Sequence, residues 1–416
     1  MTKGLHHGAQ RLAGSLLVVA VFFIPLVPLV SKLCSVLALL LLCIPAPGGF
    51  ASFKLKDKKA AFALILLFFI YVVGVTFSTN TSFAWKDVLS KTPFVLIPVL
   101  FYLLPENSSR RNRFLLGFAL GTGLLCLILL VRATINYGST GATYVFFYEA
   151  FSWKMHPTYL AIYISFSLLA MLHFTHTAGP KSSRWPRWAS AALFCFGTSV
   201  LILSSSRMGI ISGAVAILFY LWHLFFRSKT VSAGRISFYL LSAPLLFVLL
   251  NYGVNSASRF GEVKKYVKTG VQSEQSDQGS IAARLKIWES SVGLIRENFW
   301  TGTGTGDVQE ELRMLYERNN LHYALSKNLN AHNQYLQTLL ATGIAGLLLL
   351  MMVFFLPFMN YRRDKDYLAL AFLFIVALNS LTEAILEREA GVLWFSFFYG
   401  MFFCAASVDK GDMPEY

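Results

Sequence analysis

Three basic side chains lie at or near boundaries between polar and apolar sequence, and their types suit work on a phosphate-bearing substrate. His332 lies in NLNAHNQYLQTLL, residues 328–340, which closes the longest polar segment and opens an apolar run. Arg207 stands in SSSRMG between two apolar runs, and Arg284 lies inside the polar segment. Arginine binds phosphate oxygens through a planar fork of donors and stays charged at any relevant pH. A neutral imidazole can take a proton from an attacking hydroxyl.

These properties predict phosphate binding by Arg207 and Arg284 and general-base catalysis by His332. We expect His332 on the first turn of the helix that opens there, where the helix dipole and a nearby arginine both disfavour the imidazolium form. No acidic cluster with metal-ligand spacing accompanies these residues. The arginines, rather than Mg²⁺ or Mn²⁺, are therefore expected to neutralise the phosphate, and no metal or cofactor is predicted.

Each of the three residues also has a purely structural explanation. Arg207 could be a charge that extends to the membrane–water interface, and Arg284 could be a solvated residue on an amphipathic helix. His332 could be a polar helix-entry residue without chemistry, with Asn330 as the N-cap.

The elements that must position these side chains are membrane helices. Of 416 residues, 56% are hydrophobic and 14% are charged, and the mean hydropathy is +0.57, whereas soluble chains are about a quarter charged. Apolar runs of spanning length recur along the chain. The sequence thus predicts an all-α polytopic membrane protein with about twelve transmembrane helices. The predicted spans are 12–29, 32–46, 60–77, 92–104, 113–137, 157–176, 188–205, 208–226, 236–253, 334–358, 367–386 and 391–407.

Basic residues fall in alternate connections, after the second, fourth, sixth, eighth and tenth spans. The positive-inside rule therefore places these loops and both termini in the cytoplasm. The formal net charge of +15 is largely explained by this orientation, so no nucleic-acid partner is expected. The predicted organisation is a first membrane part at 1–253, an external loop at 254–333 and a second membrane part at 334–416. The five cysteines all lie in apolar spans and give no evidence of a metal or redox site.

The external loop is the only connection large enough for a small domain. Apolar residues recur at helical spacing from 281 to 296, on a face formed by Ile281, Leu285, Trp288, Val292 and Ile295. TGTGTG at 301–306 is expected to be a flexible turn, and 307–319 a second helix. Two amphipathic helices on a membrane surface would fit this pattern.

Further polar residues are weaker candidates on the same outer face. His156 is a candidate for lining the acceptor or donor path, or for a capping or packing role beside Pro157. Arg132 and Lys86 could add positive charge near the phosphates. An external patch could bind acceptor sugars or pair within itself, and external aromatic residues could stack on sugars or form an interfacial belt. The patch is Glu383, Glu387, Arg388 and Glu389; the aromatic residues are Tyr144, Phe146, Phe147, Tyr148 and Trp153.

The chain resembles the O-antigen ligase and polymerase superfamily in four motifs. These are an arginine after Ser-Ser-Ser between two spans, an Arg-x-x-x-Trp helix, a Gly-x-Gly-x-Gly turn and an Ala-His-Asn-x-Tyr-Leu entry into a span. The most specific portion is 281–346; outside it the resemblance is largely hydropathy. The matching residues are Arg207, Arg284, Trp288, Gly302, Gly304, Gly306, His332, Asn333, Tyr335 and Leu336.

This resemblance implies a GT-C-like, metal-independent, inverting glycosyltransferase of the bacterial inner membrane. Such enzymes take a glycan from an undecaprenyl-pyrophosphate carrier at the periplasmic face and pass it to an acceptor hydroxyl, which in ligases belongs to the lipid A-core. It implies that Arg207 and Arg284 bind the pyrophosphate and that His332 is the base. An O-antigen or exopolysaccharide polymerase, or a protein O-oligosaccharyltransferase, would share the motifs and differ in acceptor. A lipid-linked sugar transporter is the alternative from another class, but it should carry ionisable residues near the bilayer midplane.

Overall fold

The computed structural model describes residues 2–43, 54–104, 107–177, 187–227, 281–364 and 366–407, and these are almost entirely helical. Two-residue strands, β1 (Lys54–Leu55) and β2 (Ala406–Ser407), pair antiparallel. The helices are α1 (Thr2–Phe23), α2 (Pro28–Leu42), α3 (Lys58–Gly74), α4 (Thr81–Ser90), α5 (Pro93–Leu103), α6 (Ser108–Thr140), α7 (Tyr148–Ser152), α8 (Pro157–Thr177), α9 (Arg187–Leu203), α10 (Arg207–Arg227), α13 (Ile281–Glu297), α14 (Val308–Arg318), α15 (His322–Ser326), α16 (Gln334–Asp364), α17 (Tyr367–Ser380) and α18 (Glu389–Tyr399).

The long helices coincide with the predicted apolar segments wherever the structure describes them. Among the described residues, five helices are long and apolar enough to cross a membrane, and shorter apolar helices accompany them. The multi-span helical class is therefore confirmed, while the number of twelve stays a prediction. The ninth predicted span, 236–253, and the first part of the external loop, 254–280, lie outside the described residues.

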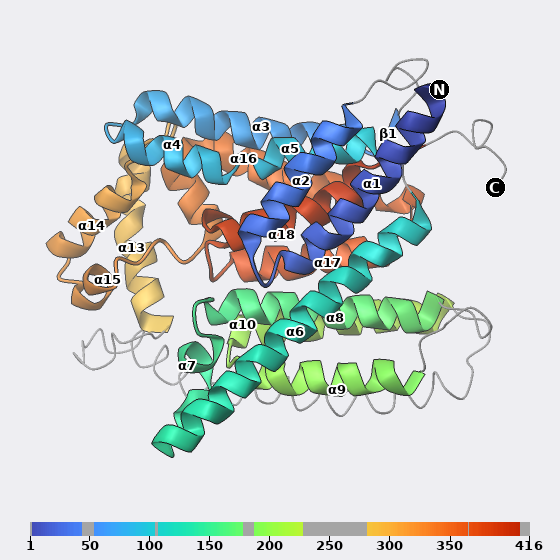
Figure 1. Ribbon diagram of the computed structural model, residues 1–416. Helices are drawn as coiled ribbons and strands as arrows, with labels where there is room; N and C mark the ends of the chain where they lie inside the picture. Colours follow the sequence, from blue (N-terminus) through green and yellow to red (C-terminus); the bar gives the residue numbers. More distant parts are fainter. Residues whose placement is uncertain are drawn as a thin grey trace.

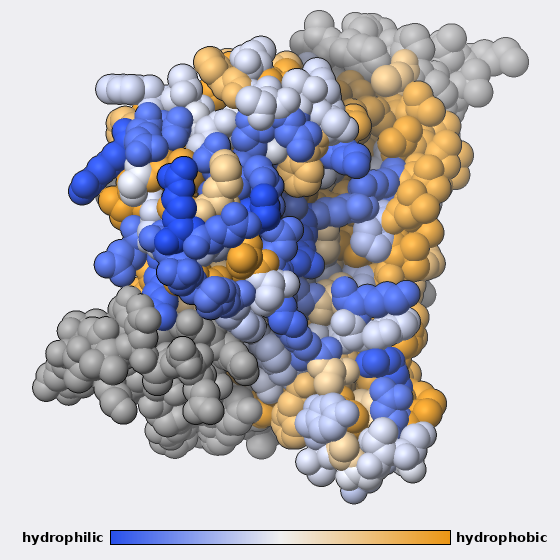
Figure 2. All heavy atoms as spheres, turned by 90° about the vertical axis from the view of Figure 1, so that its left-hand side faces the viewer, coloured by the Kyte–Doolittle hydropathy of each residue, from blue (hydrophilic) through white to orange (hydrophobic). Residues whose placement is uncertain are grey.

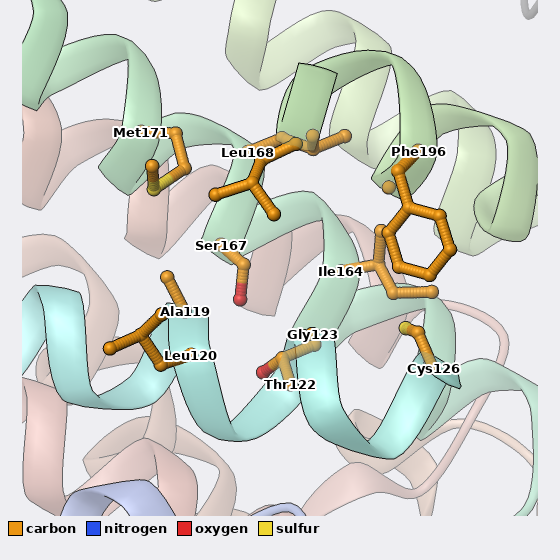
Figure 3. A pocket seen from close by; sticks show the side chains of 12 residues that line it. Ala119, Leu120, Thr122, Gly123, Cys126, Ile164, Ser167, Leu168, Met171 and Phe196 are labelled. Carbon is orange, nitrogen blue, oxygen red and sulfur yellow. The ribbon is translucent and has the colours of Figure 1, made fainter. Parts of the chain in front are cut away.

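The core of the molecule lies around α8. Its apolar window is 89% buried, and it packs against α6, α9, α10 and α17. Aromatic rings fill the space beside it, with Phe166 and Phe398 at 4.5 Å between ring centroids. A small cavity of about 40 Å³ remains between α6, α8 and α9, and the hydroxyls of Thr122 and Ser167 point into it (Figure 3).

One end of the bundle carries the short polar helices. In Figure 1, α4, α7, α13, α14 and α15 gather at the left-hand end, whereas the start of α1 and the β1 strand lie at the right-hand end. The first residues of α8, α10 and α16 face the same end as these short helices, as does the end of α17. Polar groups from distant parts of the sequence are thereby brought to one face.

The buried side of α13 differs from the predicted one. Ala283, Ile287, Ser291 and Leu294 are buried, while Val292 is 43% exposed. The face is rotated by about one residue because the small Ala283 and Ser291 allow close packing, a preference that apolar periodicity does not register. The helix packs against α14, α15 and α16 instead of presenting an apolar face to a lipid surface.

The TGTGTG segment forms a turn as predicted, but the expectation of flexibility is wrong. A Cβ at Gly302 would lie 2.6 Å from the backbone of α16, and one at Gly306 would lie 2.3 Å from the carbonyl oxygen of Asn80. The Asp307 carboxylate accepts hydrogen bonds from the backbone N–H groups of Thr79 and Asn80. Glycine serves here for close backbone approach, which fixes the turn.

Candidate active site

A buried carboxylate, Glu383, joins the polar groups at this end of the bundle. Its Oε2 lies 3.2 Å from Nδ1 of His332, 3.9 Å from Nδ1 of His156 and 3.9 Å from an Nη of Arg284. Its side chain is 6% exposed. Residues separated by more than two hundred positions thus meet around one carboxylate.

The segment that holds Glu383 is fixed at both sides. The N–H of Glu383 donates to the carbonyl of Asn379 at the end of α17, and the Asn379 amide donates to Ser212 on α10. A few residues on, the N–H of Leu386 donates to the side-chain oxygen of Gln334, the first residue of α16. Glu383 is therefore positioned by three membrane helices.

His332 lies before α16 and not on its first turn. The Asn333 side chain accepts from the N–H groups of Tyr335 and Leu336 and so caps the helix, which means that the prediction of Asn330 as the cap was wrong. Asn330 instead accepts the N–H of His332 at 3.0 Å. His332 has φ +45°, a left-handed conformation that non-glycine residues adopt only where the surroundings hold them.

Two contacts hold the backbone beside His332. The Ala331 N–H donates to the side chain of Gln337, and the Ala331 carbonyl accepts the indole N–H of Trp288 at 2.8 Å. Because Trp288 is one turn from Arg284 on α13, this bond also sets the distance between Arg284 and the imidazole.

The two histidines are held in different proton arrangements. The carboxylate of Glu383 favours a proton on Nδ1 of His332, which leaves Nε2 to act as an acceptor. The Nδ1 of His156 accepts the backbone N–H of Thr158 at 3.4 Å, so its own proton belongs on Nε2. Burial lowers the pKa of His156. In this arrangement Nε2 of His332 can accept a proton, and Nε2 of His156 can donate a hydrogen bond.

The charge of Glu383 is maintained by its neighbours. Burial alone would raise the pKa of this carboxyl, but the hydrogen bond from His332 and the positive charge of Arg284, joined in acid by the protonated His332 and His156, lower it to about 2. The predicted argument for a neutral His332 relied on a helix dipole and an arginine. The structure shows instead that a hydrogen bond to Glu383 sets the orientation of the ring.

These residues line a pocket of about 490 Å³ that is open toward the polar end of the bundle. Figure 2 shows hydrophilic residues gathered over the middle of this end, with hydrophobic residues along one flank. The pocket takes residues from α4, α13, α14, α15, α16 and the 381–388 segment. Its charged and polar lining includes Asp87, Glu149, His156, Arg284, Gln309, Lys327, His332, Gln337, Glu383, Glu387 and Arg388.

Arg207 lies near this pocket but is not among its lining residues. It begins α10, and the preceding Ser206 hydroxyl donates to Thr158 at 3.4 Å. That bond ties the start of α10 to the start of α8, next to His156. The structure therefore brings together Arg284, His332 and His156, whereas Arg207 starts a helix that is tied to the start of α8.

Two comparisons with known proteins indicate which family the chain resembles. Residues 190–351 match the family model described as O-Antigen ligase. This part of the chain is similar to O-antigen ligases. An uncharacterized protein of Haemophilus influenzae is 22% identical over 329 residues, covering 76% of this chain and 75% of that protein.

The segment that matches the O-antigen ligase family supplies only part of the pocket. Arg207, Arg284 and His332 lie inside the matched residues, whereas His156 and Glu383 lie outside them. The resemblance stated from the motifs is confirmed by the family match. His332, inside the matched segment, nevertheless forms its hydrogen bond with Glu383, which lies in a later connection outside that segment.

A second buried ionic network, which the sequence did not reveal, adjoins the matched segment. The Lys91 ammonium is fully buried and lies 2.5 Å from Asp87 and 3.0 Å from Glu387. Glu387 also accepts hydrogen bonds from Tyr71 and Gln334. Spacing gives a signal only for Asp87 and Lys91, four residues apart on one helix face.

The remaining predicted candidates have other partners. Arg132 donates to the carbonyl of Ala150 and stacks over Trp153, Lys86 does not line the pocket, and Glu389 pairs with Lys32 at 2.6 Å. Of the predicted external aromatic residues, Tyr148 lines the pocket. Over the described ranges, no group of three or more His, Cys, Asp and Glu side chains is placed to hold a metal ion.

Proposed function

We propose that this protein is a glycosyltransferase that moves a glycan from an undecaprenyl-pyrophosphate carrier to an acceptor hydroxyl. The observation that supports it best is the His332–Glu383 hydrogen bond beside Arg284 in an open polar pocket. A histidine oriented by a carboxylate is suited to remove a proton. An arginine within reach of the same pocket is suited to an anionic leaving group.

The proposed reaction is a single displacement at the anomeric carbon. Nε2 of His332 takes the proton of the acceptor hydroxyl as its oxygen forms the new glycosidic bond. The bond from the anomeric carbon to the carrier's phosphate oxygen breaks, and that oxygen keeps the electron pair. Attack from the opposite side inverts the anomeric configuration, and no metal takes part in the scheme.

The leaving pyrophosphate gains negative charge as this bond breaks. Arg284 would stabilise that charge more in the transition state than in the ground state, which lowers the barrier. Arg388 also lines the pocket and would add a second positive charge. Arg207, the first residue of α10, would act either on the phosphates or by fixing the start of that helix.

We further propose that the pocket faces the periplasm and that the protein crosses the bacterial inner membrane about twelve times with both termini in the cytoplasm. The alternating basic loops support this orientation. The preferred acceptor is the lipid A-core, as in O-antigen ligases; a growing polysaccharide or a protein is the alternative. The polar side chains gather at one end of the bundle, which favours an interfacial enzyme over a transporter.

A reconstituted assay tests this proposal. Purified protein is offered an undecaprenyl-pyrophosphate glycan together with lipid A-core, a second copy of the donor, or a hydroxyl-bearing peptide, with and without chelator. Transfer to lipid A-core that survives chelation is expected. Transfer only to the second donor or only to the peptide would show that the acceptor is not lipid A-core. Movement of intact carrier across the bilayer without transfer would overturn the enzyme proposal.

A further inference from the structure

The pocket has two chemically different walls. On one side, His332, Arg284 and Arg388 line the pocket together with the carboxylates Glu383 and Glu387, so acidic and basic groups alternate there. The wall formed by α4 and the start of α14 contributes Phe83, Asp87, Thr305, Val308 and Gln309, none of which is basic. A pyrophosphate would be repelled by the carboxylate on that wall, whereas an uncharged polyhydroxyl group would not.

The helix α4 presents a matched pair to the pocket. Phe83 and Asp87 are four residues apart, so they lie on one face of the helix, and both line the pocket. The Phe83 side chain is 47% exposed although it lies in a polar cavity. On the other side of α4, Ala84 and Val88 are buried against the rest of the protein, which fixes the direction of the pair.

The Asp87 carboxylate is held in place and keeps one oxygen for a ligand. Its Oδ1 accepts from the buried ammonium of Lys91, which is shared with Glu387. Its Oδ2 forms no hydrogen bond with the described part of the chain. A rigid carboxylate oxygen beside an exposed ring is the combination that binds a sugar, because the oxygen accepts hydroxyl protons and the ring packs on the sugar's C–H face.

We propose that Phe83 and Asp87 on α4 form the acceptor-sugar subsite, with the ring against the sugar face and Asp87 accepting its hydroxyl groups. The inference rests on the proposed function, since it takes the opposite wall as the donor side. It assigns the acceptor class as a neutral hydroxyl-rich sugar residue. Gln309 and Gln337, which also line the pocket, are placed to contact further hydroxyls of the same group.

The protonation of Asp87 gives the subsite a pH signature. Burial raises the pKa of Asp87 to about 6, with Lys91 opposing this shift and Glu387 adding to it. Lys91, Glu387 and Tyr71 are the charged and titratable groups of the network around it. Because the charged form accepts hydroxyl protons more strongly, acceptor binding should weaken in acid as Asp87 becomes protonated, at a higher pH than for an ordinary aspartate.

The test compares Phe83→Ala and Asp87→Asn with Trp85→Ala, an exposed residue of the same helix that does not line the pocket. Initial rates are measured against acceptor at saturating donor and against donor at saturating acceptor. Both subsite variants should raise the acceptor KM about tenfold and leave the donor KM unchanged. Trp85→Ala should change neither KM. In the wild type the acceptor KM should rise in acid as Asp87 becomes protonated, and Asp87→Asn should not show this rise.

A binding measurement without donor separates this inference from the proposed function. Delipidated oligosaccharide, released from lipopolysaccharide by mild acid, is added to the detergent-solubilised protein, and saturation-transfer NMR reports its contacts. Contacts that Phe83→Ala abolishes and Trp85→Ala retains support the subsite even if no glycan transfer occurs. Unchanged contacts and an unchanged acceptor KM in a Phe83→Ala protein of normal melting temperature would overturn it. Because Asp87→Asn leaves Lys91 with one carboxylate fewer, Phe83→Ala decides the outcome if that variant unfolds.

Discussion

At the scale of single residues, Glu383 is the group on which the proposed chemistry depends. One buried carboxylate faces two imidazoles and one guanidinium. It orients His332 and limits the positive charge that collects in the pocket before substrate arrives. In the proposed reaction, we therefore expect an acid at this position to affect both proton transfer and donor binding.

Replacing Glu383 or His332 should reduce turnover by different routes. His332→Ala removes the proposed base and is expected to lower kcat by about 10²–10⁴-fold. Glu383→Gln leaves the imidazole but loses control of its tautomer, and a loss of similar order is expected. Glu389→Gln, which removes only the surface pair with Lys32, should retain activity in the same transfer assay. Full activity of His332→Ala would contradict the assignment of the base.

The low pKa of Glu383 predicts the pH range of its contribution to stability. The folded-state pKa is depressed from 4.5 to about 2, so the charged form stabilises the fold above the ordinary value. That stabilisation is lost as the pH falls from about 4.5 toward 2. The difference in melting temperature between wild type and Glu383→Gln should be constant between about pH 8 and 5 and shrink below pH 4.5. A difference that changes near pH 7 would point to a histidine instead.

The sequence located two of the three residues around Glu383, Arg284 and His332, from motifs, and the third, His156, as a weaker candidate. It also named Glu383, but only as part of an external patch. The partnership of Glu383 with His332 spans 51 positions and depends on where α17 ends, at Ser380 and not within the predicted 367–386 segment. Hydropathy cannot place that end because Ala384, Ile385 and Leu386 are apolar yet lie in the connection.

At the scale of elements, α16 is broken where the TGTGTG turn meets it. Gly343 has φ +66° and ψ −166° inside the helix, and a Cβ there would lie 2.2 Å from the carbonyl oxygen of Trp300. The N–H of Ile344 donates across the break to Phe299, and the N–H of Thr303 donates to Leu340. At the break, backbone groups of α16 therefore form hydrogen bonds with residues 299–303 in place of bonds within the helix.

Gly343→Ala should destabilise the protein by at least about 2 kcal/mol, because it combines an unfavourable conformation with a steric clash. The matched control is Gly293→Ala on α13, where a Cβ would meet nothing within 4 Å. That change should be neutral or slightly stabilising. Thermal unfolding in detergent compares them, and equal melting temperatures for the two variants would show that the break carries no constraint.

The small cavity between α6, α8 and α9 gives a second test at this scale. The hydroxyls of Thr122 and Ser167 form no hydrogen bond with the described residues, and the volume of about 40 Å³ exceeds the roughly 10–15 Å³ that one water requires. We expect a water to bridge them. Ser167→Ala should then lower the free energy of unfolding by about 1 kcal/mol. Thr122→Val should lower it less in the Ser167→Ala protein than in the wild type.

The outcome depends on whether the two hydroxyls share a partner. Ser199→Ala, on the exposed side of α9 with a bond to its own helix, should change stability by less than about 0.5 kcal/mol. Additive effects of Ser167→Ala and Thr122→Val, or a gain in stability from either change, would show a dry cavity.

At the scale of the whole molecule, the helical class and the positions of the long apolar helices could be predicted from hydropathy, whereas the short helices α4, α7 and α15 lie in segments predicted as connections. The reason is that a membrane span needs a long apolar run, which is visible locally. The relation between helices could not be predicted, since burial of α8 at the centre and the meeting of α4 with the 381–388 segment depend on packing between distant parts. The buried Lys91 network is an example, as its carboxylates lie 4 and 296 residues away.

The proposed orientation can be checked on intact cells with a maleimide that does not cross the membrane. In a variant without native cysteines, Glu310→Cys lies on exposed α14 at the polar end, and Ser108→Cys begins α6 at the opposite end. Glu310→Cys should react once the outer membrane is permeable, and Ser108→Cys only after the inner membrane is opened. Reversed labelling would place the pocket in the cytoplasm.

The interlocked backbones of the TGTGTG turn and α16 bear on how such proteins can exchange parts during evolution. A crossover between related genes that joined the external segment of one to α16 of another would pair a turn and a helix break that were never selected together. Functional recombinants should therefore inherit residues 299–344 as a block. Experimental chimeras with a junction at 333 should fail to fold more often than chimeras with a junction inside α16 beyond Gly346.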